Sequence, residues 1–500
     1  MNWNIKNLFK RKQENKQESK RNYFWKKKPR IDSDVRKFEK ELNERSMGLT
    51  EAIGDRLDEN KGVFQGNINR QIRASHQRLI DVCRNLAMDN PFGARYSQMT
   101  VDNVVGSGLF PRTQMTLPTG ELDQRTNKQL DKMFYRWSEN KERVSLNGQF
   151  DFYEFCQLAE RQRIIDGEVF IILHHEDGDL KLEMIPADRC DITFDRRVDD
   201  NQVIKGGIKY DERTMKPVSY WFKKVDLLTQ TESYDYVEYD AEEVIHYFEP
   251  KQIDQLRGIS DFVPVIKTVS QLDAYIHTSI IQARVTASSM AFITQQEKSE
   301  SLLDTEEEEN ELIAEYSPGT INLLNPGQDI KSVAANTQAN EFTGWVNQVE
   351  SIIAMGLGCF KQALTGDITG VNYSSARFGD LMQQSRYKAL QRRLINTVLT
   401  RVYREFLHNL VDEDLFELPV NKVMFDTTWI KPAGKNVDPE KEIKSKILMI
   451  DNGLTSRRQV IEEMGLDPDK VDLAIAEDDF KPAEKNPINK STNQDNPQED

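Results

Sequence analysis

Residues 364–377, which read LTGDITGVNYSSAR, are the stretch that decides the fold. Apolar residues recur at helical spacing on both sides of it, over 342–355 before it and over 387–410 after it. The glycines and polar residues between these segments predict a non-helical insertion over 358–370. The hydroxyl group of Ser374 or Ser375 is the expected N-cap of the long helix that follows, because it can accept an unpaired amide of the first turn.

Further out, the chain alternates between helical and strand patterns. Apolar spacing predicts helices over 68–88, 127–137, 152–165 and 262–290, and two short helices within 439–476 that are separated at 453–455. From 167 to 249 the pattern changes to short β-branched and aromatic runs bounded by turn signals. We expect a mostly antiparallel sheet there, with strands at 169–173, 180–185, 203–210, 218–222 and 244–248, and one more strand at 321–324. The expected fold class is α+β.

Charge is distributed unevenly along the 500 residues. The chain contains 67 basic and 82 acidic residues, a net charge of -15. Residues 1–30 contain eleven basic and two acidic side chains, a net charge of +9, which leaves -24 on residues 31–500. A body this acidic argues against a protein that coats nucleic acid. The acidic run 295–312 is expected to be a solvated loop, because a metal site needs ligands folded around one point.

Cysteine usage and hydropathy indicate the compartment. The four cysteines lie far apart and form no CxxC pair, which excludes a zinc ribbon and argues against a disulfide framework. The most apolar long window, 276–293, contains a histidine, a glutamine and an arginine, so we expect a buried or subunit-packed helix there and no bilayer span. We therefore expect a soluble protein that is made in the cytoplasm and does not contact a membrane.

No pattern typical of an enzyme, a cofactor site or a metal site is present. The chain lacks a P-loop, an HExxH motif and a GxSxG elbow. His174 and His175 are adjacent in a predicted strand, so their side chains should point to opposite faces. Ser374 and Ser375 are the nearest candidates for a nucleophile, but no histidine lies within 30 residues of them to act as the base. We predict that the protein is not an enzyme and has no cofactor.

The residues around Ser374 and Ser375 resemble a sequence signature of a known protein family. LTGD at 364–367 and NYSSAR at 372–377 closely resemble the LTGD…NYSSAR signature of the lambda-type phage portal proteins. The resemblance continues in family order, with VVGSG at 104–108, DGEVF at 166–170, GIKYD at 207–211, VIHYF at 244–248, QLRGIS at 255–260, VDP at 437–439 and GLTSR at 453–457. It covers roughly residues 70–475.

The resemblance implies a portal fold with a mixed α/β wing, a helical stem, a small clip, a tunnel loop and a helical crown. Usually twelve such subunits form a ring at one vertex of the phage head, and double-stranded DNA passes through its channel during packaging and ejection. The implied partners are the terminase large subunit, the major capsid protein, the scaffold and a head-tail adaptor. The implied location is the virion, after assembly in the host cytoplasm.

Combining this plan with the sequence patterns divides the chain into nine parts. They are a basic disordered arm (1–30), N-terminal helices and a sheet-rich wing (31–260), a first stem helix (261–292), a clip (293–338), a second stem helix (339–357), a tunnel loop (358–378), a long spine helix with more of the wing (379–430), a crown (431–476) and a disordered tail (477–500).

Net acidity suits a protein through which DNA slides, because a basic lining would gain affinity with every phosphate that it neutralised. We expect the tunnel loop to make the closest and most transient DNA contacts. Its candidate residues are Lys361, Thr365, Asp367, Asn372, Tyr373, Ser374, Ser375 and Arg377. Each of them could instead cap a helix or bridge neighbouring subunits.

Two other hypotheses remain beside the portal. One is a serine hydrolase that uses Ser374 or Ser375, and the other is a capsid-associated protein that binds nucleic acid through the basic arm 1–30. A particle near twelve times 58.0 kDa, about 696 kDa, would support the portal, whereas a stable monomer would leave the other two.

Overall fold

The computed structural model describes residues 67–287 (apart from 118, 177, 200, 227 and 230), 291–295, 328–332, 339–412 (apart from 371), 427–432 and 439–478. The basic arm, most of the acidic run 295–312, the predicted strand 321–324 and the tail from 479 lie outside the described residues. The chain divides into two compact units. The first contains residues up to 104 and 137–417, and the second contains 105–136 and the residues from 418 onward.

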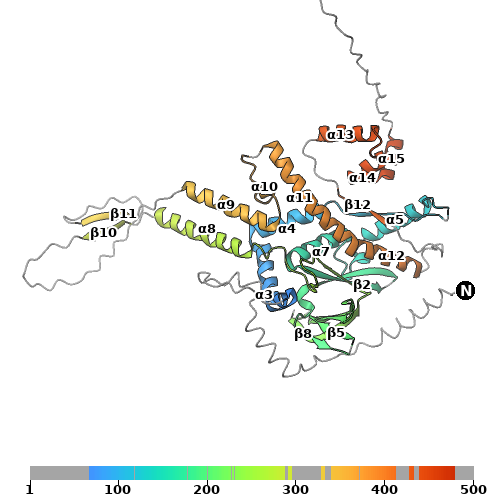
Figure 1. Ribbon diagram of the computed structural model, residues 1–500, viewed down its shortest axis with the longest axis horizontal. Coiled ribbons are helices and arrows are strands. Elements are labelled where there is room, and N and C mark those ends of the chain that lie inside the picture. The colour runs from blue at the N-terminus through green and yellow to red at the C-terminus, as the bar shows by residue number, and fades with distance from the viewer. Residues whose placement is uncertain are drawn as a thin grey trace, which may run out of the picture. The chain divides into compact units, whose positions relative to one another are not determined.

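The first unit combines helices with two sheets, and the sheet that contains β5 (Gln202–Lys205) and β8 (Thr231–Asp240) lies at the lower edge of the fold in Figure 1, below the labelled helices. The helices are α3 (Ile68–Asp89), α4 (Pro91–Val104), α6 (Lys141–Val144), α7 (Phe152–Asp166), α8 (Ile266–Ala287), α9 (Ala339–Leu357), α10 (Lys361–Thr365), α11 (Tyr373–Leu394) and α12 (Thr400–Asp412), with a 3-10 turn at Ala187–Arg189. A π-helical turn, Ile395–Leu399, joins α11 to α12. The predicted long helix 379–410 is therefore longer at both ends and is interrupted once.

Two antiparallel sheets occupy 168–248, where the sequence predicted one. Their strands are β2 (Glu168–Glu176), β3 (Asp179–Pro186), β4 (Arg196–Arg197), β5 (Gln202–Lys205), β6 (Ile208–Asp211), β7 (Pro217–Asp226), β8 (Thr231–Asp240) and β9 (Val244–Phe248), in the orders β3-β2-β9 and β4-β5-β6-β7-β8. The predicted single strand 203–210 is wrong. Gly206 and Gly207 both have positive φ and turn the chain between β5 and β6. β8 was not predicted, and β10 (Ala291–Gln295) pairs with β11 (Gln328–Ser332) as a further hairpin.

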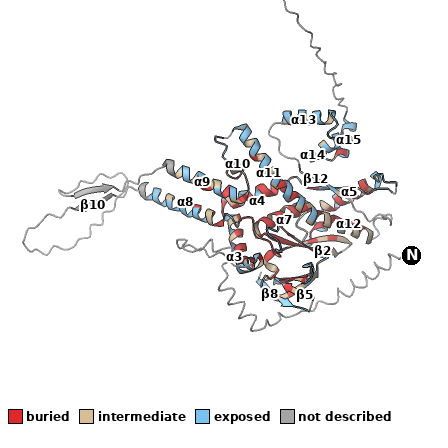
Figure 2. Cartoon of the chain, viewed as in Figure 1, coloured by how far each residue is buried: buried red, intermediate tan, exposed pale blue. Residues whose placement is uncertain are grey.

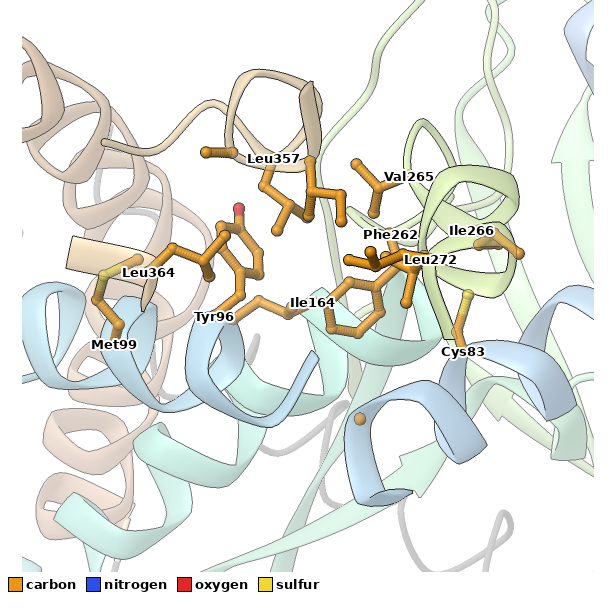
Figure 3. Packing of buried hydrophobic residues seen from close by; sticks show 14 of the residues in the cluster. Cys83, Tyr96, Met99, Ile164, Phe262, Val265, Ile266, Leu272, Leu357 and Leu364 are labelled. Carbon is orange, nitrogen blue, oxygen red and sulfur yellow. The ribbon is translucent and has the colours of Figure 1, made fainter. Parts of the chain in front are cut away.

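The main core of the first unit lies where α3, α4 and α7 meet the first half of α8 and the second half of α9 (Figure 3). Phe262 and Leu272 are fully buried there, and the ring of Tyr96 meets that of Phe262 edge-on at 5.9 Å. The residue just before α8 lies close to α9, since a Cβ on Gly356 would be 2.5 Å from the side chain of Val265. The core therefore holds one end of the helix pair α8–α9.

Two glycines fix the crossing between α7 and the segment that leads into α8. Gly167 ends α7 with a φ of 91°, and a Cβ there would lie 2.4 Å from the backbone of Ile259. A Cβ on Gly258 would lie 2.3 Å from the carbonyl oxygen of Gly167. Such distances are shorter than any real contact, so both backbones approach this closely only because neither residue has a side chain.

The side chains beside these glycines form a buried ion pair. Glu168 and Arg257 are both at most 3% exposed, and Arg257 Nε donates to Glu168 Oε1 at 2.6 Å. The other guanidinium nitrogens donate to the carbonyl oxygens of Ala187, Cys190 and Gly206, at distances of 2.8–3.1 Å. A buried ion pair is stable only when its remaining donors and acceptors are also satisfied, and that condition is met here.

Two histidines complete the surroundings of Glu168. His246 Nε2 lies 2.8 Å from Glu168 Oε2, His76 Nε2 lies 3.5 Å from Oε1, and the amide of Gly258 donates to Oε2 at 2.6 Å. Burial lowers the pKa of both histidines, against the opposing effect of the carboxylate. Although burial opposes ionisation of Glu168, Arg257 and the two histidines hold its pKa well below the usual range.

The second unit is small and largely exposed. β1 (Phe110–Thr113) pairs antiparallel with β12 (Thr427–Ile430), and Trp429 packs edge-on against Phe134 of α5 (Gln124–Ser138) at 6.3 Å. Three helices follow, α13 (Pro439–Asp451), α14 (Arg457–Glu463) and α15 (Pro468–Glu477). The sequence predicted only two helices here, because the turn before Asp467, which caps α15, lacks a strong break in the pattern.

The buried pair predicts a large effect of Arg257→Leu. Loss of the guanidinium group leaves the carboxylate of Glu168 buried without a cation. This should lower the free energy of unfolding by about 3–5 kcal/mol. The matched control is Arg197→Leu, because the Arg197–Glu212 pair is 66% and 44% exposed and should contribute less than about 1 kcal/mol. Thermal and urea unfolding of both variants measure the difference, and equal effects would contradict the prediction.

The two buried histidines predict acid sensitivity. Because the folded state lowers their pKa, the unfolded chain binds more protons below about pH 6.5. Stability should therefore fall as the pH drops from 7.5 to 5.5, by at most about 1.4 kcal/mol for each histidine. His246→Gln, which keeps a donor for Glu168, should flatten the profile, whereas replacement of the exposed His277 should not. A melting temperature that is independent of pH over this range would refute the idea.

Candidate functional site

The stretch that contains the eight candidate residues connects α9 to α11. Gly358, with a φ of 66°, ends α9, and a short helix α10 follows where the sequence predicted a non-helical insertion. This prediction was wrong because the five residues Lys361–Thr365 are too few to show a helical period. The N-cap prediction was also wrong, since Asn372 caps α11 by accepting the amide of Ser375 at 2.8 Å.

The first half of the connection between α9 and α11, which includes α10, is fixed to the main core. The amide of Phe360 donates to Gln383 of α11 at 3.2 Å, and the Phe360 ring fills the space beside Gly379, where a Cβ would lie 2.6 Å from the ring. Leu364 is buried in the main core, and Arg95 donates to the carbonyl oxygen of Ala363. α10 is therefore positioned by α4 and α11 together.

Lys361 is held by α9. Its ammonium group lies 3.2 Å from the carboxylate of Glu350 and donates to the carbonyl and side-chain oxygens of Asn347 at 3.0 and 2.9 Å. Only 20% of each of the two charged side chains is exposed. These contacts pair the ammonium group of Lys361 within the chain. The geometry therefore favours a structural role, in which Lys361 holds the loop against α9.

The second half of the stretch is an exposed turn between Gly366 and Gly370. Asp367 accepts the amide and the hydroxyl of Thr369 at 2.9 and 2.6 Å, and these hydrogen bonds lower its pKa. The hydroxyl of Thr365 donates to the carbonyl oxygen of Lys361 and accepts the amide of Asp367. This turn is thus internally bonded and carries a carboxylate that stays ionised at neutral pH.

Charge of the opposite sign follows at the start of α11. Tyr373 begins the helix, and Ser374, Ser375 and Arg377 are exposed in its first turns. Arg377 forms no ion pair with any residue that the structure describes. The structure therefore separates the two cations of the candidate set, since Lys361 is engaged and Arg377 faces solvent.

Exposed apolar side chains lie beside this turn. Ile368, Phe378, Leu381 and Met382 are 59–78% exposed, and the last three lie at helical spacing on one face of α11. Side chains of this size are seldom so exposed together unless the face meets another surface.

The helix pair α8–α9 exposes a second apolar face, and its α8 part overlaps the window 276–293, for which the sequence predicted a buried or subunit-packed helix. No residue of α8 from 273 to 284 and none of α9 from 342 to 348 is buried, as the pale blue outer halves in Figure 2 show. Tyr275 nevertheless packs on Trp345 at 4.1 Å and on Phe342 at 5.6 Å. Ile280, Ile281 and Ile352 are 44–46% exposed.

Low charge accompanies this exposure. Five of the 41 residues of α8 and α9 are Asp, Glu, Lys or Arg, against 30% of the whole chain. A solvated helix pair normally carries more charge, whereas the centre of a protein interface is depleted in it. This scarcity of charge is the sequence signal that could have extended the prediction for 276–293 to α9.

Chemistry other than binding finds little support. His174 contacts Glu183 and His175 contacts Asn409, on opposite faces of β2 as expected, and His76 and His246 share Glu168. None of these four imidazoles therefore serves Ser374 or Ser375 as a base. The four cysteines are free, and the described residues contain no cluster of three or more side chains suited to a metal. No helix in the described ranges could span a bilayer.

Comparison with known proteins identifies what the chain resembles. Residues 55–391 match the family described as phage portal protein, lambda family. A probable portal protein of Halomonas phage phiHAP-1 is 22% identical over 426 residues, which cover 83% of this chain and 82% of that protein. Portal protein B of Escherichia phage lambda is 22% identical over 257 residues, 45% of this chain and 48% of that protein. A chain from the neck of a native GTA particle computed with C12 symmetry aligns with a TM-score of 0.46 at 14% identity, over 78% of this chain and 94% of that one.

Proposed function

The chain belongs to the lambda family of phage portal proteins, and from that premise we propose how its parts divide the work. The family is structural and has no enzymatic role, so the chain forms the portal ring at the capsid vertex through which DNA is packaged and ejected. The serine hydrolase hypothesis is thereby set aside. We propose that the ring contains twelve copies and that α8 and α9 form its stem, with the clip between them over 293–338.

The exposed, charge-poor helix pair α8–α9 is the observation that carries this assignment. Among the described residues, the two helices of its outer half pack only on each other, and Tyr275 and Trp345 remain 39% and 42% exposed. Full burial of a large apolar side chain contributes about 1.5–3 kcal/mol, and a monomer forgoes the share of it that belongs to the exposed part. In the proposed ring, each helix pair packs between two neighbouring pairs and gains that energy on both sides.

The proposed tunnel loop is 358–378, and Arg377 is its proposed DNA contact. A single exposed guanidinium per subunit binds a passing phosphate weakly, while the ionised Asp367 on the same loop opposes tight binding. In this proposal, Thr365, Asn372 and Lys361 hold the conformation of the loop through contacts within the chain. Tyr373, Ser374 and Ser375 are proposed to follow Arg377 along the channel surface.

The remaining partners follow from the family resemblance. We propose that the terminase large subunit and a head-tail adaptor dock on the ring, that the wing faces the major capsid protein and scaffold, and that assembly takes place in the host cytoplasm. The basic arm 1–30 is proposed to contact the scaffold, the capsid shell or the packaged DNA. Deletion of residues 1–30 tests the arm, since normal head assembly and packaging would rule this role out.

Ring formation should depend on the helix pair. The double variant Ile281→Glu/Ile352→Glu places two carboxylates on the exposed face and should convert particles near 696 kDa into monomers of 58.0 kDa. Leu228→Glu is the matched control, because Leu228 is 92% exposed in the turn between β7 and β8. Mass photometry of both variants measures the mass of their particles. Intact rings in the double variant, with unchanged circular dichroism, would contradict the assignment of α8–α9.

The two cations of the loop should behave differently. Arg377→Ala should reduce DNA packaging without changing ring mass or melting temperature, because the side chain has no described ionic partner. Lys361→Ala should lower the melting temperature, because it leaves Glu350 and Asn347 without their shared donor. In vitro packaging and thermal unfolding of both variants measure this. Normal packaging by Arg377→Ala would remove the proposed contact.

A further inference from the structure

The helix α5 of the second unit carries a row of basic residues on its exposed side. This row, the α5 stripe, consists of Arg125, Lys128, Lys132 and Arg136, and all four are exposed. Steps of three and four residues place these side chains within an arc of about 80° and along about 17 Å of the helix. The four charges therefore point together into solvent, although residues 31–500 carry a net charge of -24.

No carboxylate of the described residues neutralises the α5 stripe, since none of its four side chains forms an ion pair there. Asp131 is the only acidic residue of α5, and its carboxylate accepts the amide of Thr113 in β1 at 3.0 Å. Like charges three and four residues apart repel each other and destabilise a helix. An anion from outside the chain would remove this repulsion.

The helices that contact α5 and β1 do not supply that anion. Three carboxylates of α14 and α15 are already paired with arginines, in Glu462–Arg112, Asp469–Arg458 and Asp472–Arg457. α15 instead adds a cation, because the ammonium group of the exposed Lys470 lies 4.4 Å from the centre of the Tyr135 ring. Tyr135 is about 20° from Lys128 around α5, so Lys470 extends the stripe by one charge.

We propose that the α5 stripe binds the phosphate backbone of double-stranded DNA. The other exposed residue within this side of α5 is Gln129, so the surface has no apolar centre. The centre of a protein interface, by contrast, is apolar and depleted in lysine. Lysine, arginine and glutamine are side chains that contact phosphate oxygens, and such contacts need no particular base sequence. The surface therefore fits DNA better than it fits a protein.

This site is separate from the channel contact proposed for Arg377. Each neutralised phosphate adds affinity, so four or five cations in every copy would hold DNA, whereas a single one lets it slide. The α5 stripe is thus suited to DNA that is at rest against the protein.

DNA binding by the full-length protein tests the site. Lys128→Gln/Lys132→Gln/Arg136→Gln should weaken binding of a random duplex of about 12 base pairs by about tenfold or more at about 50 mM salt. The slope of log K against log salt should fall by about three, one for each cation removed. Fluorescence anisotropy at several salt concentrations measures both quantities.

The matched control is Arg196→Gln/Arg213→Gln/Lys216→Gln. It removes the same charge from three exposed residues on a surface that also carries Asp211 and Glu212, and it should change neither quantity. The basic arm 1–30 is present in every protein compared, so it does not cause a difference between the variants. Both variants should keep the particle mass and melting temperature of the unmodified protein.

Acetylation of the unmodified protein gives a second readout that needs no variant. Bound DNA should slow acetylation of Lys128 and Lys132 several-fold and leave that of Lys216 unchanged, as measured by mass spectrometry. Equal weakening by the two triple variants, or equal acetylation of the stripe with and without DNA, overturns the inference and leaves an acidic protein surface as the partner. Ring formation is measured separately by particle mass, so failure of the proposed ring is distinguishable from failure of this site.

Discussion

The buried pair of Glu168 and Arg257 is the interaction on which the first unit depends. It joins residues 89 positions apart and brings the start of β2 against the segment that leads into α8. Removing two charges from water is costly, and the cost is offset here only because every donor of Arg257 and both oxygens of Glu168 find partners. The glycines next to the pair matter for the same reason, because any side chain at Gly167 or Gly258 would push the two backbones apart.

A second buried network continues from this crossing toward α11. Arg163 of α7 binds Glu160 and Asp261, and Tyr247 of β9 donates to Glu160 at 2.6 Å. Arg386 of α11 then makes a two-pronged contact with Glu249, whose pKa the two neighbouring cations hold well below its usual range against the effect of burial. The base of α8, the end of β9 and the helix that carries the exposed loop are thus linked by charges that cannot separate cheaply.

Most helices could be predicted from the sequence, because a helix depends on residues that are close to one another along the chain. Apolar spacing located most helices to within a few residues, and the family motifs marked the crossing at DGE and RGIS. The sequence could not show why those motifs exist, since Glu168 meets Arg257 only after folding. It also misassigned the N-cap of α11, where serine and asparagine are nearly equivalent as caps, and it missed β8, in which four acidic residues obscure the alternation. In the candidate site, sequence reasoning grouped Lys361 with Arg377, because the ionic partner that distinguishes them lies on another helix.

The distribution of charge among the segments says more about the proposed ring than the net charge of the chain does. α8 and α9 together carry three acidic and two basic residues, so the proposed stem is almost neutral. These helices therefore carry very little of the -24 of residues 31–500, so in the proposed ring any repulsion of DNA comes from other segments. A neutral wall is still compatible with sliding, because affinity for DNA arises from neutralised phosphates, and a wall without cations neutralises none. In the proposed ring, the low charge of α8 and α9 also favours close packing between copies, because like charges repeated around a ring would repel each other at every interface.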